Sequence, residues 1–313
     1  MFFVVLPGAG FLSSAEPPRA SPIGLLETST LFAVYGRAFG VAPILGRLGT
    51  YKGLDDMAAD TQPWVQKIAE ANDGKQVTIG IHLIYAIAVP CTKQNTDCVQ
   101  YLNGDLVKEY IEPAAKRGWV VILDTQLGRS NPIEQIKHIK EQGYLKYDNV
   151  HVAIDPEFHA SSAQVDPGIP VGTVSASDIN AVQEILDTYV ESEHLKAKKI
   201  LIVHQFGDPA VHDGVPFMVQ QKKTLKSYPN VELVIDADGL GSPAVKIWKY
   251  NAMTDTQMYP GVGFRGIKIF FPNRWEQNGH FDKPPMTVDE IFGVKNAPGA
   301  RRIASKPNVI IIA

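Results

Sequence analysis

The strongest constraint on the fold of this chain is a series of short apolar segments that recurs along its whole length. Most are continuously apolar and rich in β-branched residues, which is typical of parallel strands covered on both faces. The segments are residues 31–36, 77–89, 119–124, 150–155, 199–206, 231–236, 266–271 and 308–313. They predict eight strands.

Stretches with helical periodicity fill the intervals between these segments. The expected helices lie within residues 53–72, 103–118, 131–143, 175–195, 214–229, 242–253 and, more weakly, 287–296. Asn131 is a candidate N-cap before Pro132, Gly143 a C-terminal stop, and Ser177 and Asp178 are plausible caps. Eight strands alternating with helices predict an α/β fold, a (β/α)8 TIM barrel.

The alternative fold is an open doubly wound sheet. The segment "GRAFGVAPILGRLG" after the first strand lacks the G-x-G-x-x-G order, which argues against dinucleotide binding. No helix follows the eighth strand, so an eighth helix is missing from the predicted ring. We expect an N-terminal extension, residues 1–30, to cover part of that position, and residues 31–313 to form a single barrel domain.

The 313 residues are 45% hydrophobic and carry a formal net charge of −3, enough apolar material for a large core. No concentrated basic surface predicts binding to nucleic acid. Residues 1–22 resemble the apolar and cleavage regions of a signal peptide without its positive start, and their apolar part is too short to span a bilayer. They are either a signal remnant or a mature extension. The oligomeric state stays open.

Cys91 and Cys98 enclose a polar, turn-rich segment, "CTKQNTDC". In an exported protein this pattern predicts a disulfide that closes a surface loop, whereas in a cytosolic protein the two would be free thiols. Two cysteines alone do not make a zinc site. We expect an exported protein, either secreted or a cell-surface lipoprotein.

Polar residues gather at the ends of the predicted strands, where a (β/α)8 barrel places its active site. They are Tyr35, Arg37, His82, Tyr85, Asp124, Gln126, Asp155, Glu157, His159, His204, Gln205, Asp236, Asp238 and Lys268. Because strand side chains alternate with a period of two, Asp155, Glu157 and His159 are expected on one side. Crowded carboxylates cannot all ionise, so at least one pKa should be raised, as a general acid requires.

The first functional hypothesis is glycoside hydrolysis without a cofactor, on a carbohydrate or cell-wall glycan. Glu157 is the expected general acid and Asp155 its supporting carboxylate, with Asp236 or Asp124 opposing them. The remaining polar residues would bind substrate, and the aromatic residues Tyr35, Phe158, Phe206 and Trp275 could line a sugar groove. Structural roles compete for several: His82 as a core histidine, Arg37 as a brace, Tyr85 in packing and Asp238 as a cap. His138 and His151 are expected at the surface.

The Asp155-x-Glu157 pattern at the end of the fourth strand is similar to the arrangement in (β/α)8 muramidases and chitinase-like glycoside hydrolases. That resemblance implies that Glu157 is the proton donor and Asp155 its support. The segments "ILDTQLGRSNP", "IDPEFH", "LIVHQF" and "GIKIFF" also resemble a group of uncharacterised exported bacterial barrel proteins, a likeness that implies no activity.

Two other functions stay open. Asp155, Glu157, His159, His204 and Asp236 are ligand types suited to Zn²⁺ or Mn²⁺ in a metal-dependent hydrolase or isomerase. The protein could also be a non-catalytic carbohydrate- or cell-wall-binding lipoprotein on a degenerate barrel.

Overall fold

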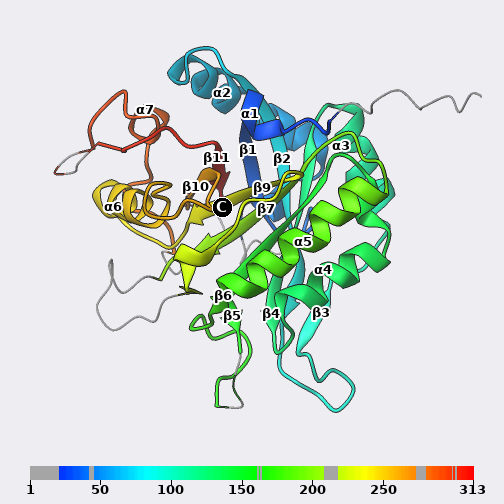
Figure 1. The fold of residues 1–313 in the computed structure, drawn as a ribbon. Helices are drawn as coiled ribbons and strands as arrows, with labels where there is room; N and C mark the ends of the chain where they lie inside the picture. Colours follow the sequence, from blue (N-terminus) through cyan, green and yellow to red (C-terminus); the bar gives the residue numbers. More distant parts are fainter. Residues whose placement is uncertain are drawn as a thin grey trace, which may run out of the picture.

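The computed structural model describes residues 21–41, 46–160, 162, 164–207, 218–272, 280–297, 299 and 302–313. Eight parallel strands close into a barrel with helices between them, which confirms the predicted (β/α)8 fold (Figure 1). The barrel strands are β1 (Ser29–Gly36), β2 (Gln76–Ala88), β4 (Val120–Gly128), β5 (Val150–His159), β7 (Lys199–Gln205), β9 (Val231–Ala237), β10 (Phe264–Ile269) and β11 (Val309–Ile312). The ring is closed because β1 pairs with both β2 and β11: Leu31 is aligned with Thr78 and with Val309.

Most of the expected helices are present around the barrel. They are α2 (Leu54–Ala71), a π-helical turn Val107–Ile111 that continues into α3 (Glu112–Lys116), α4 (Pro132–Glu141), α5 (Ala176–Ser192), α6 (Pro243–Met253) and the short α7 (Val288–Ile291). Asn131 caps α4 as predicted, since its side chain accepts the Glu134 N–H. The cap of α5 is Ser175 rather than Ser177 or Asp178. Ser175 and Asp178 form a reciprocal capping box.

The helix predicted over residues 214–229 is wrong for the part that the structure describes, and residues 208–217 lie outside it. A short strand β8 (Val219–Gln220) pairs with β6 (Val174–Ser175), and a 3₁₀ turn follows at Lys222–Thr224. The side chain of Lys222 points inward, where its Nζ donates to Gln205 Oε1 and to the Met253 carbonyl. A lysine anchored to the barrel in this way holds its segment flat against the strands.

Two hydrophobic clusters follow from the alternation of side chains along the strands. The larger cluster, with Phe32, Ile81 and Leu123, lies between the barrel and the helices. The smaller one fills the barrel interior and includes Leu31, Ala33, Ile122, Ala153, Ile202 and Val234. These interior residues form the lower layers of the barrel and leave its upper part, at the strand C-termini, to polar side chains.

Residues 1–20 lie outside the described residues, so the expected cover of the eighth-helix position by residues 1–30 stays a prediction. The described part of the N-terminal extension begins at residue 21. It crosses the barrel end at which the strands begin, away from the loop that joins β2 to β3 (Figure 1). The backbone N–H groups of Leu25 and Leu26, in the short helix α1 (Leu25–Thr28), donate to the Glu232 carboxylate at 3.0 and 2.9 Å. Because Leu26 is fully buried in the interior cluster, this segment closes the floor of the barrel.

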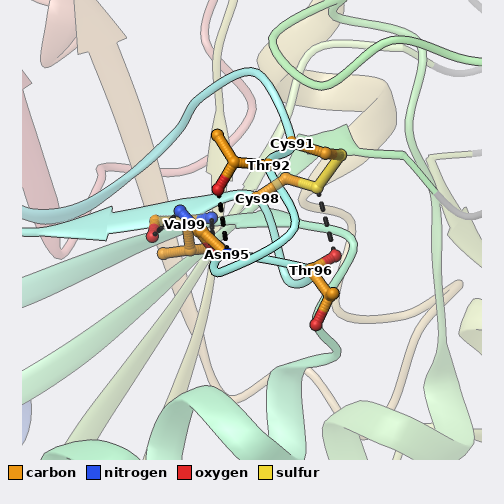
Figure 2. Close-up of a disulfide and its surroundings, with 6 residues drawn as sticks. All are labelled: Cys91, Thr92, Asn95, Thr96, Cys98 and Val99. Carbon is orange, nitrogen blue, oxygen red and sulfur yellow. Dashed lines mark hydrogen bonds between the residues drawn. A yellow bond between two sulfur atoms is a disulfide. The ribbon is translucent and has the colours of Figure 1, made fainter.

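Cys91 and Cys98 form the predicted disulfide, in the loop between β2 and the short antiparallel strand β3 (Val99–Tyr101) (Figure 2). Asn95 braces the loop: its backbone N–H donates to Thr92 Oγ1 and its side chain to the Val99 carbonyl. Among the described helices, none is both long and apolar enough to cross a membrane.

Candidate functional site

Polar side chains from seven strands converge on the axis in the upper part of the barrel. They are Tyr35, His82, Asp124, Gln126, Asp155, Glu157, His204, Asp236, Asp238 and Lys268, with Asp238 directly after the end of β9. All were expected in the site from the sequence. The structure brings them together because each occupies an inward position of its strand. The strand register places Tyr35 beside His82, Gln126 beside Asp155 and His204 beside Asp236.

The deepest part of this group is a buried chain of two histidines and two aspartates. Asp124 Oδ2 lies 3.1 Å from His82 Nε2 and 3.3 Å from His204 Nε2. The two Nε2 atoms are 3.3 Å apart. On its other side, His204 Nδ1 lies 2.8 Å from Asp236 Oδ2. Gly266 makes room for Asp236, because a Cβ there would lie 2.9 Å from Asp236 Oδ1.

The charges in this chain shift its pKa values strongly. Burial and Lys268 lower the pKa of His204, but the Asp124 and Asp236 carboxylates outweigh them and raise it well above its usual value. Burial raises the pKa of Asp124, but the two histidines lower it by more, so the pKa lies well below its usual value. For His82 burial dominates, and its pKa falls. Asp124 therefore remains a carboxylate at neutral pH.

Tyr35 and Lys268 lie over the buried chain. The Tyr35 ring meets the His82 and His204 rings edge-on, with centroids 5.1 and 5.9 Å away. Lys268 Nζ lies 3.6 Å from the centre of the Tyr35 ring and donates to Asp238 Oδ2 at 2.9 Å. Asp238 also accepts the Gly239 N–H through Oδ1. Despite burial, Lys268 and His204 lower the pKa of Asp238 to about 2.

Above this layer a pocket of about 620 Å³ opens at the strand C-termini, in the size range of small-molecule sites. Its lining includes Tyr35, Gln126, Glu157, Phe206, Asp238 and Lys268. Burial, followed by the charge of Asp238, raises the pKa of Glu157 to about 7. The pocket therefore holds one carboxyl group that is still partly protonated at neutral pH and one that is ionised.

Asp155 lies below Glu157 on β5 and is almost completely buried. Neither of its carboxyl oxygens has a hydrogen-bond partner among the described residues. Burial, followed by the charge of Glu157, raises the pKa of Asp155 well above its usual value. Its neutral form is therefore favoured more strongly than in an ordinary aspartate.

Four residues expected in the site lie elsewhere. Arg37 donates to the Ile84 carbonyl, which fits the bracing role. Tyr85 faces the helices, where its hydroxyl contacts His138 Nε2 at 3.0 Å. His159 Nδ1 contacts the Thr173 carbonyl at 2.6 Å, and Gln205 faces outward to Lys222. Tyr85, His159 and Gln205 are therefore kept apart from the converging groups.

One further residue differs from its sequence interpretation, and one residue of the pocket was not expected. His151, expected at the surface, is buried, and its Nδ1 accepts the Ile200 N–H. Trp275 lies outside the described residues, whereas Phe158 and Phe206 line the pocket as the sugar-groove hypothesis proposed. Lys249 on α6 also lines the pocket and was missed. Its only signal is that Lys246 and Lys249 follow the end of β9 three residues apart, on one face of α6.

The structure also changes the set of residues that could hold a metal ion. Among the described residues, ligand atoms come close together in the set His82, Asp124 and His204, and in the set His204, Asp236 and Asp238. Asp155, Glu157 and His159, which the metal hypothesis included, belong to neither set. A metal centre built from either of these sets would lie deeper in the barrel than the sequence suggested.

Comparisons with protein-family models, with curated proteins and with solved structures found no match to this chain.

Proposed function

We propose that the protein hydrolyses glycosidic bonds in the pocket at the C-terminal end of the barrel, with Glu157 as general acid and Asp238 as the opposing carboxylate. The observation that carries this proposal is that two carboxyl groups from different strands line one open pocket of suitable size. Glycoside hydrolysis needs such a pair, with one member protonated and the other ionised. Burial keeps Glu157 protonated, whereas Lys268 keeps Asp238 ionised.

The assignment of the second carboxylate differs from the first hypothesis. Asp124 and Asp236 are fully buried and held by the two histidines, so they are not available to a substrate in the pocket. Asp238 lines the pocket itself. Burial favours the neutral form of Asp155 below Glu157, and this form adds no negative charge that would disfavour the developing glutamate.

In the proposed reaction, Glu157 transfers its proton to the glycosidic oxygen as the bond to the anomeric carbon breaks. Asp238 stabilises the positive charge that develops at that carbon and then accepts a proton from the attacking water, whose hydroxyl group bonds to the carbon. Exchange with solvent removes this proton from Asp238 and returns one to Glu157. The rings of Phe158 and Phe206 support binding of a sugar because they offer apolar faces at the pocket wall. The substrate class is a carbohydrate or cell-wall glycan.

The decisive experiment compares leaving groups. The purified full chain is screened on aryl glycosides and on cell-wall fragments, and the active class is repeated with Glu157→Gln. Loss of the general acid should lower kcat/KM by about 10²–10⁴-fold for a leaving group that needs protonation. It should have little effect for dinitrophenyl glycosides, which leave without a proton.

Glu141→Gln is the matched control, because Glu141 is exposed at the end of α4 and should leave both rates unchanged. No turnover of any glycoside by folded wild-type protein would refute the proposal. Sugar binding that Glu157→Gln does not alter, again without turnover, would instead favour a non-catalytic binding protein.

We also infer that the protein works outside the cytoplasm. The disulfide between Cys91 and Cys98 supports this location, since such bonds persist in oxidising compartments. Cell fractionation combined with alkylation of free thiols tests it. Recovery of the protein in the cytoplasm with both thiols reduced would contradict it.

A further inference from the structure

We propose that His82, Asp124 and His204 bind one divalent transition-metal ion, preferentially Zn²⁺, inside the barrel beneath Tyr35. This site is separate from the acid and base of the proposed reaction, because none of its three ligands lines the pocket. It also differs from the metal set that the sequence suggested, with which it shares only His204.

The first argument is the shape of the triangle formed by the three ligand atoms. Its sides are 3.1 Å from Asp124 Oδ2 to His82 Nε2, 3.3 Å from Asp124 Oδ2 to His204 Nε2, and 3.3 Å between the two nitrogens. Zinc binds imidazole nitrogen and carboxylate oxygen at about 2.0–2.1 Å with tetrahedral geometry, which separates neighbouring ligand atoms by about 3.3 Å. The triangle therefore has the dimensions of one face of a zinc coordination sphere.

The second argument is that hydrogen bonds explain the triangle poorly. Each Nε2 carries either one hydrogen or one lone pair, directed along the plane of its ring. A single hydrogen on each nitrogen cannot be donated to two partners. At least one side of the triangle therefore joins two donors or two acceptors. Charge-assisted N–H···O bonds are about 2.7–2.9 Å long, as between His204 and Asp236, whereas both histidine–Asp124 sides are longer. A cation that accepts all three lone pairs removes this conflict.

The third argument is the environment of the ligands. Metal-bound histidines usually donate their other ring nitrogen to a carboxylate, which fixes the ring and directs the free lone pair at the metal. Asp236 is placed to do this for His204, with 2.8 Å between Oδ2 and Nδ1. Asp124 Oδ1 is fully buried and has no hydrogen-bond partner among the described residues, so the carboxylate has spare capacity to bind a cation.

The position of Tyr35 between the proposed ion and the pocket limits the role of that ion. The Tyr35 ring packs against both histidine rings and separates them from the pocket, and Lys268 Nζ lies against the same ring. An ion in this position holds β2, β4 and β7 together across the barrel axis. Its positive charge would also stabilise the layer of residues beneath the pocket, although the ion itself would not contact the substrate.

The test uses the full chain without any substrate, so its outcome is independent of the proposed hydrolysis. The protein is stripped with a chelator, dialysed against Zn²⁺ and analysed for bound metal, and Co²⁺ is then substituted to record its visible spectrum. We expect about one zinc per chain and the intense absorption of tetrahedral Co²⁺, with X-ray absorption showing two imidazole ligands.

Three variants locate the site. His82→Gln and Asp124→Asn should abolish stoichiometric zinc binding, and Asp236→Asn, which removes only the support of His204, should weaken it by about 10–100-fold. His194→Asn is the matched control: His194 is exposed with a positive φ of 57°, which asparagine tolerates, and zinc binding should not change.

Circular dichroism shows whether each variant is folded. If a variant is not folded, the cobalt spectrum of the wild type shows whether the protein binds a tetrahedral metal ion. Folded wild-type protein that retains less than about a tenth of an equivalent of zinc would overturn the proposal. Equal zinc binding by folded His82→Gln and Asp124→Asn would overturn it as well. So would nitrogen NMR that finds His204 protonated on both nitrogens in the presence of zinc.

Discussion

Glu157 and Asp238 line one pocket, but their surroundings move their pKa values in opposite directions, to about 7 and about 2. Burial dominates the shift of Glu157, and the negative charge of Asp238 adds to it. Asp238 is more deeply buried than Glu157, but Lys268 donates to it and, together with His204, holds it in the charged form. The lysine and the histidine therefore separate the two carboxyl groups into an acid and a base.

The first prediction concerns the pH dependence of catalysis. Because a general acid must be protonated, kcat/KM should be constant below a pH of about 7 and fall about tenfold per pH unit above it. Asp238, with a pKa of about 2, should cause no loss in the weakly acidic range. Rates on a glycoside with a poor leaving group, measured from pH 4 to 9, test this profile. A rate that rises through pH 7 would contradict the role of Glu157.

The second prediction concerns stability. The pKa of Glu157 is about 7 in the folded protein, whereas its ordinary value is 4.5. As the pH rises, the unfolded chain therefore loses this proton at a lower pH than the folded protein does. Glutamate at this position therefore lowers stability progressively as the pH rises from about 4.5 to 7. The glutamine of Glu157→Gln cannot ionise. The free energy of unfolding of this variant, relative to that of the wild type, should therefore increase by up to about 3 kcal/mol between pH 4 and pH 8. Urea unfolding at both pH values measures this, and an equal difference at both would refute it.

The third prediction concerns the buried ion pair. Lys268→Met should destabilise the protein by about 3–5 kcal/mol, because it leaves the buried Asp238 carboxylate without its cation. It should also raise the pKa of Asp238 and thereby reduce activity near neutral pH. Lys137→Met is the control, since its pair with Glu134 is exposed and should be worth less than about 1 kcal/mol. Similar losses in the two variants would argue against a buried charged pair.

The fourth prediction concerns the disulfide. Replacing Cys91 and Cys98 together by serine should lower the free energy of unfolding by about 2–3 kcal/mol, as expected for so short a loop. Thermal unfolding with and without a reductant measures this. The reductant should lower the Tm of the wild type and leave that of the double variant unchanged.

Much of the fold could be predicted because eight continuous apolar runs leave few alternatives to a closed parallel barrel. The alternation of side chains also placed Asp124, Asp155, Glu157 and Asp236 correctly on the inner face. The same rule could have excluded Gln205, because it follows His204 directly and adjacent residues on a strand face opposite sides. The alternation rule failed for His159 because the pairing of β4 with β5 is irregular after Asp155. Gln126 pairs with Asp155 and Gly128 pairs with His159, so two residues of β4 span the same distance as four residues of β5.

Other features depend on contacts between distant residues. Nothing in the segment around Lys222 indicates that its side chain would reach Gln205. The approach of His82 to His204 depends on ring orientations across the barrel, which no local pattern specifies. Whether Asp238 or Asp236 is the carboxylate that lines the pocket depends on how far the pocket extends down the axis.

The attachment of Leu25 and Leu26 to Glu232 has a consequence for the order of folding. The partners are separated by 207 and 206 residues, and Glu232 belongs to the sixth barrel strand. During synthesis the N-terminal segment must therefore wait for most of the chain before it finds its carboxylate, and contacts so distant form slowly. Until that point water can enter the barrel from below, so the sealing of this end is expected among the last events of folding.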